Sequence, residues 1–167
     1  MIPRRKLLLY AGAAFGSATI ASSIMVGQWW NTAAQEPYAN LNKEEANITL
    51  LIAKAAFPAG EHHNVDGGQA HLDRFFDQFL GHLQPQNRAL LKLLVQATDR
   101  VSIPLYGQYF SNLPSHEQQS CLEYLLNHQQ HLIRSAYQSL IAILGMGYCT
   151  HPEMAEKLSR LHRCGYG

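Results

Sequence analysis

Hydrophobic positions recur every three or four residues through most of the chain after residue 42, which is the spacing of amphipathic helices. The first helix is predicted to begin at Asn42, a capping residue with Glu45 three positions later, and to end at Phe57, before Pro58. The next predicted helix carries a single apolar stripe, formed by Leu72, Phe75, Phe76, Phe79, Leu80 and Leu83.

The helix after Pro85 is expected to lie at the centre of the domain. It is predicted from Arg88 to Val101, and leucines occupy most of its sides. A helix that is apolar on most sides is usually buried. Pro104 is predicted to end it, and residues 104–114 then form a proline-bounded loop rich in aromatic side chains.

Two amphipathic helices and a short terminal one complete the pattern. One is predicted to start near Ser115, and the other has apolar residues at helical spacing from Leu132 to Leu144. Gly145 and Gly147 are expected to end that helix, and Pro152 to start the last one. Because no run alternates with a period of two residues, the chain is predicted to be all-α, a compact bundle of about five or six helices.

The N-terminus has the pattern of a targeting segment. Arg4 and Arg5 precede an apolar or small run from Leu7 to Trp30, and no charged residue follows until Glu36. This arrangement is typical of a twin-arginine export signal and points to the periplasm of a bacterium. A run of about 24 residues also suffices to span a bilayer. The leader is therefore expected to be either a cleaved signal, with a cleavage site near 32–34, or an uncleaved anchor in the inner membrane; a buried helix is the third possibility.

The chain is accordingly predicted to consist of a leader (1–34), a linker (35–41) and one helical domain (42–167). Hydrophobic residues make up 47% and charged residues 15%, a composition that argues against disorder. The net charge is +1, and beyond the three basic residues of the leader the acidic residues outnumber the basic ones. No basic surface is therefore expected to hold nucleic acid, and a nucleic-acid partner is not predicted.

The three cysteines leave two pairing states open. Cys149 and Cys164 flank the last predicted helix, so they can form a disulfide in an oxidising compartment or remain free thiols. Cys121 falls in an apolar helical pattern and is expected to be a small buried hydrophobe. No CxxC or CxxCH motif occurs, so no c-type haem attachment is predicted.

Nine histidines raise the question of a metal site. His128 and His131 are three positions apart, on one face of a predicted helix, and His62 and His63 are adjacent in a loop. A zinc-type site needs three or four converging ligands. Histidines on a solvated polar face are the alternative, and no metal ligand is assigned.

The acidic residues and the motif content indicate no catalytic centre. Asp73 and Asp77 fall opposite the stripe of Phe75 and Phe79, and they are expected to form a solvated face. The motifs GxSxG, GxGxxG and GxxxxGK[ST] do not occur. No catalytic or cofactor-binding residue is therefore predicted in this chain.

The glycine- and tyrosine-containing segment 145–154 is the most unusual local feature. Glycines let the backbone approach another surface closely, and tyrosines are favoured interface anchors. A plain helical turn that closes the core is the alternative. Partner contacts are expected at Tyr106, Tyr109, Phe110, Tyr148, Pro152 and Tyr166.

The chain from Asn42 to Gly167, with its leader, resembles the gluconate 2-dehydrogenase subunit 3 family, the small subunits of membrane-bound flavin-dependent dehydrogenases. The final element resembles that family's G-Y-[YF]-x-x-P-E-V pattern, with Cys149 in place of a second aromatic residue. The segments that carry the resemblance are Ala55-Ala56-Phe57-Pro58, the helix with Phe75 and Phe79, Phe110 to Gln118, and Gly147 to Met154.

The resemblance implies a non-catalytic accessory subunit. Its expected partner is a large FAD-dependent subunit of the glucose–methanol–choline (GMC) type, which acts on sugars, sugar acids or alcohols and holds the FAD; a c-type cytochrome often accompanies it. Arg4 and Arg5 would then direct the whole complex to the twin-arginine translocase. Two alternatives remain: a stand-alone, membrane-tethered histidine-rich protein that binds metal or haem, and an enzyme in its own right.

Overall fold

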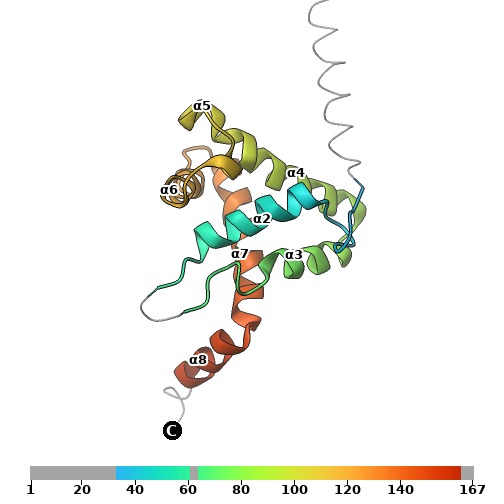
Figure 1. Ribbon diagram of the computed structural model, residues 1–167, viewed down its shortest axis with the longest axis vertical. Helices are drawn as coiled ribbons and strands as arrows, with labels where there is room; N and C mark the ends of the chain where they lie inside the picture. The colour runs from blue at the N-terminus through green and yellow to red at the C-terminus, as the bar shows by residue number, and fades with distance from the viewer. Residues whose placement is uncertain (1–32, 61–63, 163–167) are drawn as a thin grey trace, which may run out of the picture. The chain divides into compact units, whose positions relative to one another are not determined.

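The structure, a computed structural model, describes residues 33–60 and 64–162 (Figure 1). Every regular element within these ranges is helical, and six of the helices have ten residues or more, so the predicted all-α class is confirmed. The elements are α2 (Lys43–Ala56), α3 (Leu72–Gly81), α4 (Pro85–Val101), α5 (Ile103–Tyr106), the 3-10 helix η1 (Phe110–Asn112), α6 (Ser115–Leu126), α7 (His131–Thr150) and α8 (Pro152–His162).

The capping signal at Asn42 places the start of α2 correctly. The Glu45 backbone N–H donates to Asn42 Oδ1 at 2.7 Å, and the Asn42 N–H donates to Glu45 Oε2 at 3.0 Å. This reciprocal pair satisfies two N–H groups that a helix start otherwise leaves open. The helix ends at Ala56, and the Phe57 N–H donates to Ala53 O at 2.9 Å, one residue before Pro58.

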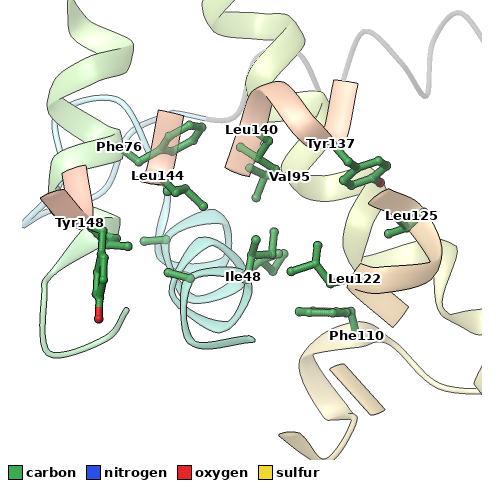
Figure 2. Close-up of a cluster of buried hydrophobic side chains, with 14 of the residues drawn as sticks. Ile48, Phe76, Val95, Phe110, Leu122, Leu125, Tyr137, Leu140, Leu144 and Tyr148 are labelled. Atoms are coloured by element: carbon green, nitrogen blue, oxygen red, sulfur yellow. The ribbon is translucent and has the colours of Figure 1, made fainter. Parts of the chain in front are cut away.

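The centre of the bundle is α2, which contacts α3, α4, α6 and α7 (Figure 1). Ile48 and Ile52 of α2 are buried, and Figure 2 shows Ile48 within the cluster of core side chains. The other helices contribute the large buried side chains of this core, among them Phe76, Val95, Phe110, Leu122, Leu125, Tyr137, Leu140 and Leu144.

The expectation that α4 is central was wrong. Val95 is the only apolar side chain of α4 that is fully buried, whereas Leu90 is 55% exposed. The buried side of α4 is mixed: beside Val95 it carries the polar residues Lys92, Gln96, Thr98 and Asp99, and the partly buried Leu91, Leu94 and Val101 pack on the core. The prediction that Pro104 ends this helix and opens a loop was also wrong. Pro104 lies in the first turn of α5, a position that proline tolerates, and η1 follows.

The expectation that Gly145 and Gly147 end the long helix was also wrong, since α7 continues to Thr150. Gly147 is needed inside the helix because a Cβ atom there would lie 2.4 Å from Cδ1 of Phe75 on α3. Glycine is unfavourable in a helix interior by up to about 1 kcal/mol, which the packing between α3 and α7 offsets. The last helix then begins at Pro152, as predicted.

Several predictions concern positions outside the described residues. These are the leader to residue 32 with Arg4 and Arg5, the loop histidines His62 and His63, Cys164 and Tyr166. Within residues 33–60 and 64–162, no helix combines the length and the apolar character needed to cross a membrane.

Candidate functional site: a polar clamp and an outward apolar face

The segment that precedes α2 is fixed to α3 by one carboxylate. Asp77 Oδ1 accepts the N–H groups of Asn40 at 2.8 Å and Leu41 at 2.9 Å, and its Oδ2 accepts the N–H of Ala39 at 3.0 Å. The Asn40 side chain returns a fourth bond to the Asp77 carbonyl at 2.9 Å. Bonds to an ionised acceptor are stronger than neutral ones. The backbone of residues 39–41 is therefore held against α3.

A second acid of α3 holds the residue just before this stretch. The Tyr38 hydroxyl donates to Asp73 Oδ2 at 2.6 Å, and this bond, together with burial, raises the pKa of Tyr38 to about 12. Asp73 Oδ1 is buried, and no described group donates to it. The expectation that Asp73 and Asp77 form a solvated face was therefore wrong, because residues far earlier in the chain cover both carboxylates; each residue is only 7% exposed.

A buried ion pair joins the same segment to α2 and α4. Lys92 Nζ of α4 lies 3.1 Å from Glu45 Oε2 of α2, and it also donates to Asn40 O at 3.0 Å. Gln96 Nε2, one turn further along α4, donates to Glu45 Oε1 at 2.6 Å. Removing one partner of such a pair strands a buried charge, so the pair acts as a unit.

We call this set of residues the clamp: Tyr38, Asn40, Glu45, Asp73, Asp77, Lys92 and Gln96. Sequence analysis missed it. The available signals were two acids four positions apart in α3 and a lysine inside a leucine-rich helix. The carboxylates of Glu45 and Asp77 are occupied by N–H donors and a lysine, so the clamp is suited to holding a chain segment rather than to acid–base chemistry.

Polar groups near the other end of α4 hold the aromatic loop. Asp99 Oδ1 accepts the Ser111 N–H at 2.8 Å, and the Ser102 hydroxyl donates to Gln108 O at 2.7 Å. Gln118 of α6 donates from Nε2 to Phe110 O at 3.0 Å. The polar side of α4 is therefore satisfied from the clamp at one end and from the loop at the other.

The side of α4 opposite these polar residues is apolar, and two residues at its edges, Leu94 and Val101, still pack against the core. We call this side the leucine face: Leu90, Leu93, Leu94, Ala97 and Val101. Leu90 is 55% exposed, Ala97 is exposed, and the other three are half-buried. Positions 90, 94, 97 and 101 follow a four-three-four spacing, which keeps them on one side of a helix. The apolar surface continues onto α5, where Ile103 is 39% and Leu105 45% exposed.

The residues expected to contact a partner differ in how exposed they are. Tyr109 is 47% exposed, Pro152 is exposed and Tyr106 is half-buried. Phe110 and Tyr148 are buried in the core of this chain, at 0% and 7% exposure, so naming them as partner contacts was wrong.

Tyr148 has partners within the described chain. Its hydroxyl donates to Val65 O at 2.6 Å, and its ring stacks on Phe57 with 4.8 Å between centroids. Burial raises its pKa. Its large ring and single hydroxyl suit a core position that offers one acceptor.

The histidines do not converge within the described residues. His128 lies in the turn after α6 and His131 begins α7, so the prediction that they share a helical face was wrong. Among residues 33–60 and 64–162, no three His, Cys, Asp or Glu side chains are placed to hold a metal.

Two of the cysteines are placed by the structure. Cys121 is buried, as predicted, and burial raises the pKa of its thiol. Cys149 is exposed near the end of α7. Its proposed pairing with Cys164 stays a prediction, because Cys164 lies outside the described residues.

A shallow groove lies between the C-terminal end of α2 and α6. Two adjoining hollows of about 270 and 400 Å³ share Ala55, Pro58 and Gln119 in their walls. Leu51, Leu122 and Leu126 add apolar surface, whereas Lys54, Asp66 and Glu123 add charges of both signs. This mixed lining selects no particular ligand class.

Comparisons with protein-family models, with curated proteins and with solved structures found no match to this chain.

Proposed function

We propose that this chain is the non-catalytic small subunit of a periplasmic, membrane-associated, FAD-dependent dehydrogenase of sugars, sugar acids or alcohols. The observation that carries the proposal is the Arg4–Arg5 leader ahead of a helical domain with the motifs quoted above. In this role the chain supplies the export signal for a GMC-type large subunit, which holds the FAD; a c-type cytochrome often accompanies such a pair.

The clamp supports this role because it fixes residues 38–41, which follow the leader, to the folded helices. A signal joined to a folded domain can direct a partner that binds that domain. Binding of the partner also stabilises whichever folded state it selects, by mass action. The small subunit would thereby aid the assembly and stability of the flavoprotein as well as its export.

The export role is tested by replacing the twin arginines in the full chain, Arg4→Lys with Arg5→Lys, in cells that make both subunits. The measurement is the amount of large subunit in periplasmic and membrane fractions. Export of the partner should fall to background, because lysine keeps the charge but removes the paired guanidinium groups. Lys6→Arg, which also keeps the charge but leaves the arginine pair intact, is the control. Normal export of the partner in the double variant would contradict the proposal.

The accessory role is tested separately by affinity purification of the C-terminally tagged full chain from detergent-solubilised native membranes. The expected eluate contains a second, larger chain and has a flavin absorbance spectrum, and dehydrogenase activity depends on that larger chain. A single band of this chain without flavin would contradict the proposal. Metal analysis of that band would then test the histidine-rich alternative.

A further inference from the structure

The backbone changes from free to packed at the bond between Ala34 and Gln35. Ala33 and Ala34 are exposed, and neither has a hydrogen-bond partner among the described residues. The Gln35 N–H, in contrast, donates to Leu41 O at 3.0 Å, and Gln35 O accepts the Tyr38 N–H at 2.9 Å. Residues 35–41 therefore form a closed loop, and the clamp holds this loop on α3.

The chain on the N-terminal side of this bond offers what a peptidase needs. An extended peptide is bound through its backbone N–H and C=O groups, so these groups must be accessible. A signal peptidase also requires small side chains around the bond that it hydrolyses, in an A-x-A-like pattern. Ala34 occupies the first position before the bond and Thr32 the third, and residues 31–34 directly follow the apolar run that ends at Trp30.

The next alanine along the chain is closed to such an enzyme. The N–H groups of Ala39 and Asn40 donate to the Asp77 carboxylate at 3.0 and 2.8 Å, so a peptidase that bound this stretch as an extended strand would have to break the clamp. The third position before a bond after Ala39 is Pro37, which does not fit the pattern. The packed loop thus leaves the bond before Gln35 as the accessible one.

We propose that a signal peptidase hydrolyses the Ala34–Gln35 bond after export, and that the fold then holds the new N-terminus. The inference rests on the proposed function, because the leader must first carry the chain to the periplasm. The processed chain begins with the loop 35–41 and keeps every contact of the clamp. Its attachment to the membrane then depends on the other subunits of the complex.

The chemistry of the step suits the loop. Hydrolysis breaks the C–N bond, places the hydroxyl of a water molecule on the Ala34 carbonyl carbon, and leaves its remaining proton with the Gln35 nitrogen. At neutral pH the products are a carboxylate and an ammonium group. Leu41 O, which already accepts the Gln35 N–H at 3.0 Å, is an acceptor for this ammonium group, and a charged donor strengthens the bond.

The first measurement is the mass of the C-terminally tagged full-length gene product, purified from cells that also make the large subunit. The intact mass and the mass of the N-terminal peptide identify the first residue. We expect it to be Gln35, either as free glutamine or as the lactam that forms when its amine displaces ammonia from its own side-chain amide.

Two matched variants then test which side chain the peptidase reads. Side chains alternate along an extended chain, so Ala34 shares a side with position 32 whereas Ala33 points to the other side. Ala34→Leu should lower the processed fraction by about tenfold or more, because a pocket that fits a methyl group rejects a larger side chain. Ala33→Leu should be processed like the wild type. Both alanines are exposed, and circular dichroism checks that both variants are folded.

Three outcomes would overturn the inference: a chain in the periplasmic and membrane fractions that keeps its leader, a first residue other than Gln35, or normal processing of Ala34→Leu. The location of the large subunit in the same cells separates this failure from that of the proposed function. An exported large subunit beside an unprocessed chain would overturn the processing site alone, whereas a large subunit that stays in the cytoplasm would contradict the proposed function itself.

Discussion

Replacing Gly147 with alanine is expected to destabilise the domain, whereas the same replacement at Gly145 is expected to stabilise it. Both residues lie inside α7, and the two variants differ only in what the new methyl group meets. At Gly145 the nearest atom is Cζ of Phe57, 3.6 Å from the ideal Cβ position, which is an ordinary contact. At Gly147 the Cβ would lie 2.4 Å from Cδ1 and 2.5 Å from Cγ of Phe75.

The magnitudes follow from two opposing effects. Alanine is favoured over glycine in a helix interior by about 0.5–1 kcal/mol, and Gly145→Ala should keep that gain in the free energy of unfolding. Forcing a methyl group into a filled contact costs about 1–3 kcal/mol, so Gly147→Ala should lose about 1–2 kcal/mol net. Turning the Phe75 ring away would also disturb its contact with Phe79, whose ring centroid is 6.3 Å away. The two melting temperatures should differ by roughly 10 °C.

The assay is thermal and urea unfolding of the full chain in detergent, followed by circular dichroism at a helical wavelength. A double-mutant cycle with Phe75→Ala separates the clash from other effects. In the Phe75→Ala background, Gly147→Ala should no longer destabilise, since the atoms that it met are gone. The reasoning is refuted if Gly147→Ala matches the wild type while Phe75 is present, or if the penalty persists after Phe75 is removed.

The clamp gives three more predictions, each measured by urea unfolding of the full chain. Asp77→Ala should lower the free energy of unfolding by about 3 kcal/mol, because it leaves three backbone N–H groups without their acceptor. Asp77→Asn should lower it less, because the amide keeps one oxygen. A decrease for Asp77→Ala no larger than that of the exposed control Glu44→Gln would contradict this prediction. Lys92→Met should cost about 3–5 kcal/mol because it strands the buried carboxylate of Glu45, and a loss below about 1 kcal/mol would count against a buried pair. Tyr38→Phe should cost about 1 kcal/mol at neutral pH through the lost bond to Asp73. The folded-state pKa of Tyr38 is raised from 10.0 to about 12, so the stabilisation from its hydroxyl is complete below pH 10 and is lost as the pH rises through 12. The difference in free energy of unfolding between wild type and Tyr38→Phe should therefore narrow over that range. A constant difference would show that this hydroxyl is not the group that titrates.

The elements that sequence predicted well depend on neighbours a few positions away. The start of α2 needs only Asn42 and Glu45, and the start of α8 needs only Pro152. The end of α7 was missed because Gly147 serves inside the helix to leave room for Phe75, which belongs to another helix. No local pattern distinguishes a glycine that ends a helix from one that lets a ring approach it.

The site was missed for a related reason. A lysine in a run of leucines suggests a buried helix with one solvated position, and paired acids on a stripe-bearing helix suggest a polar surface. In the structure both are covered by residues 38–41, whose backbone N–H and C=O groups carry no sequence signature. Tyr148 illustrates the same limit, since the sequence alone does not distinguish this buried tyrosine from an exposed one such as Tyr109.

The clamp also bears on the fate of the leader. Leu41 is fully buried, and Tyr38, Asn40 and Leu41 all have bonded partners on other elements, so the segment 38–41 belongs structurally to the bundle. Residues 33–35 are exposed and precede the clamp. Cleavage near residues 32–34 would therefore leave every contact of the clamp intact, whereas loss of the chain through Leu41 would strand Asp77 and the Lys92–Glu45 pair. The fold of the domain consequently tolerates either fate of the leader.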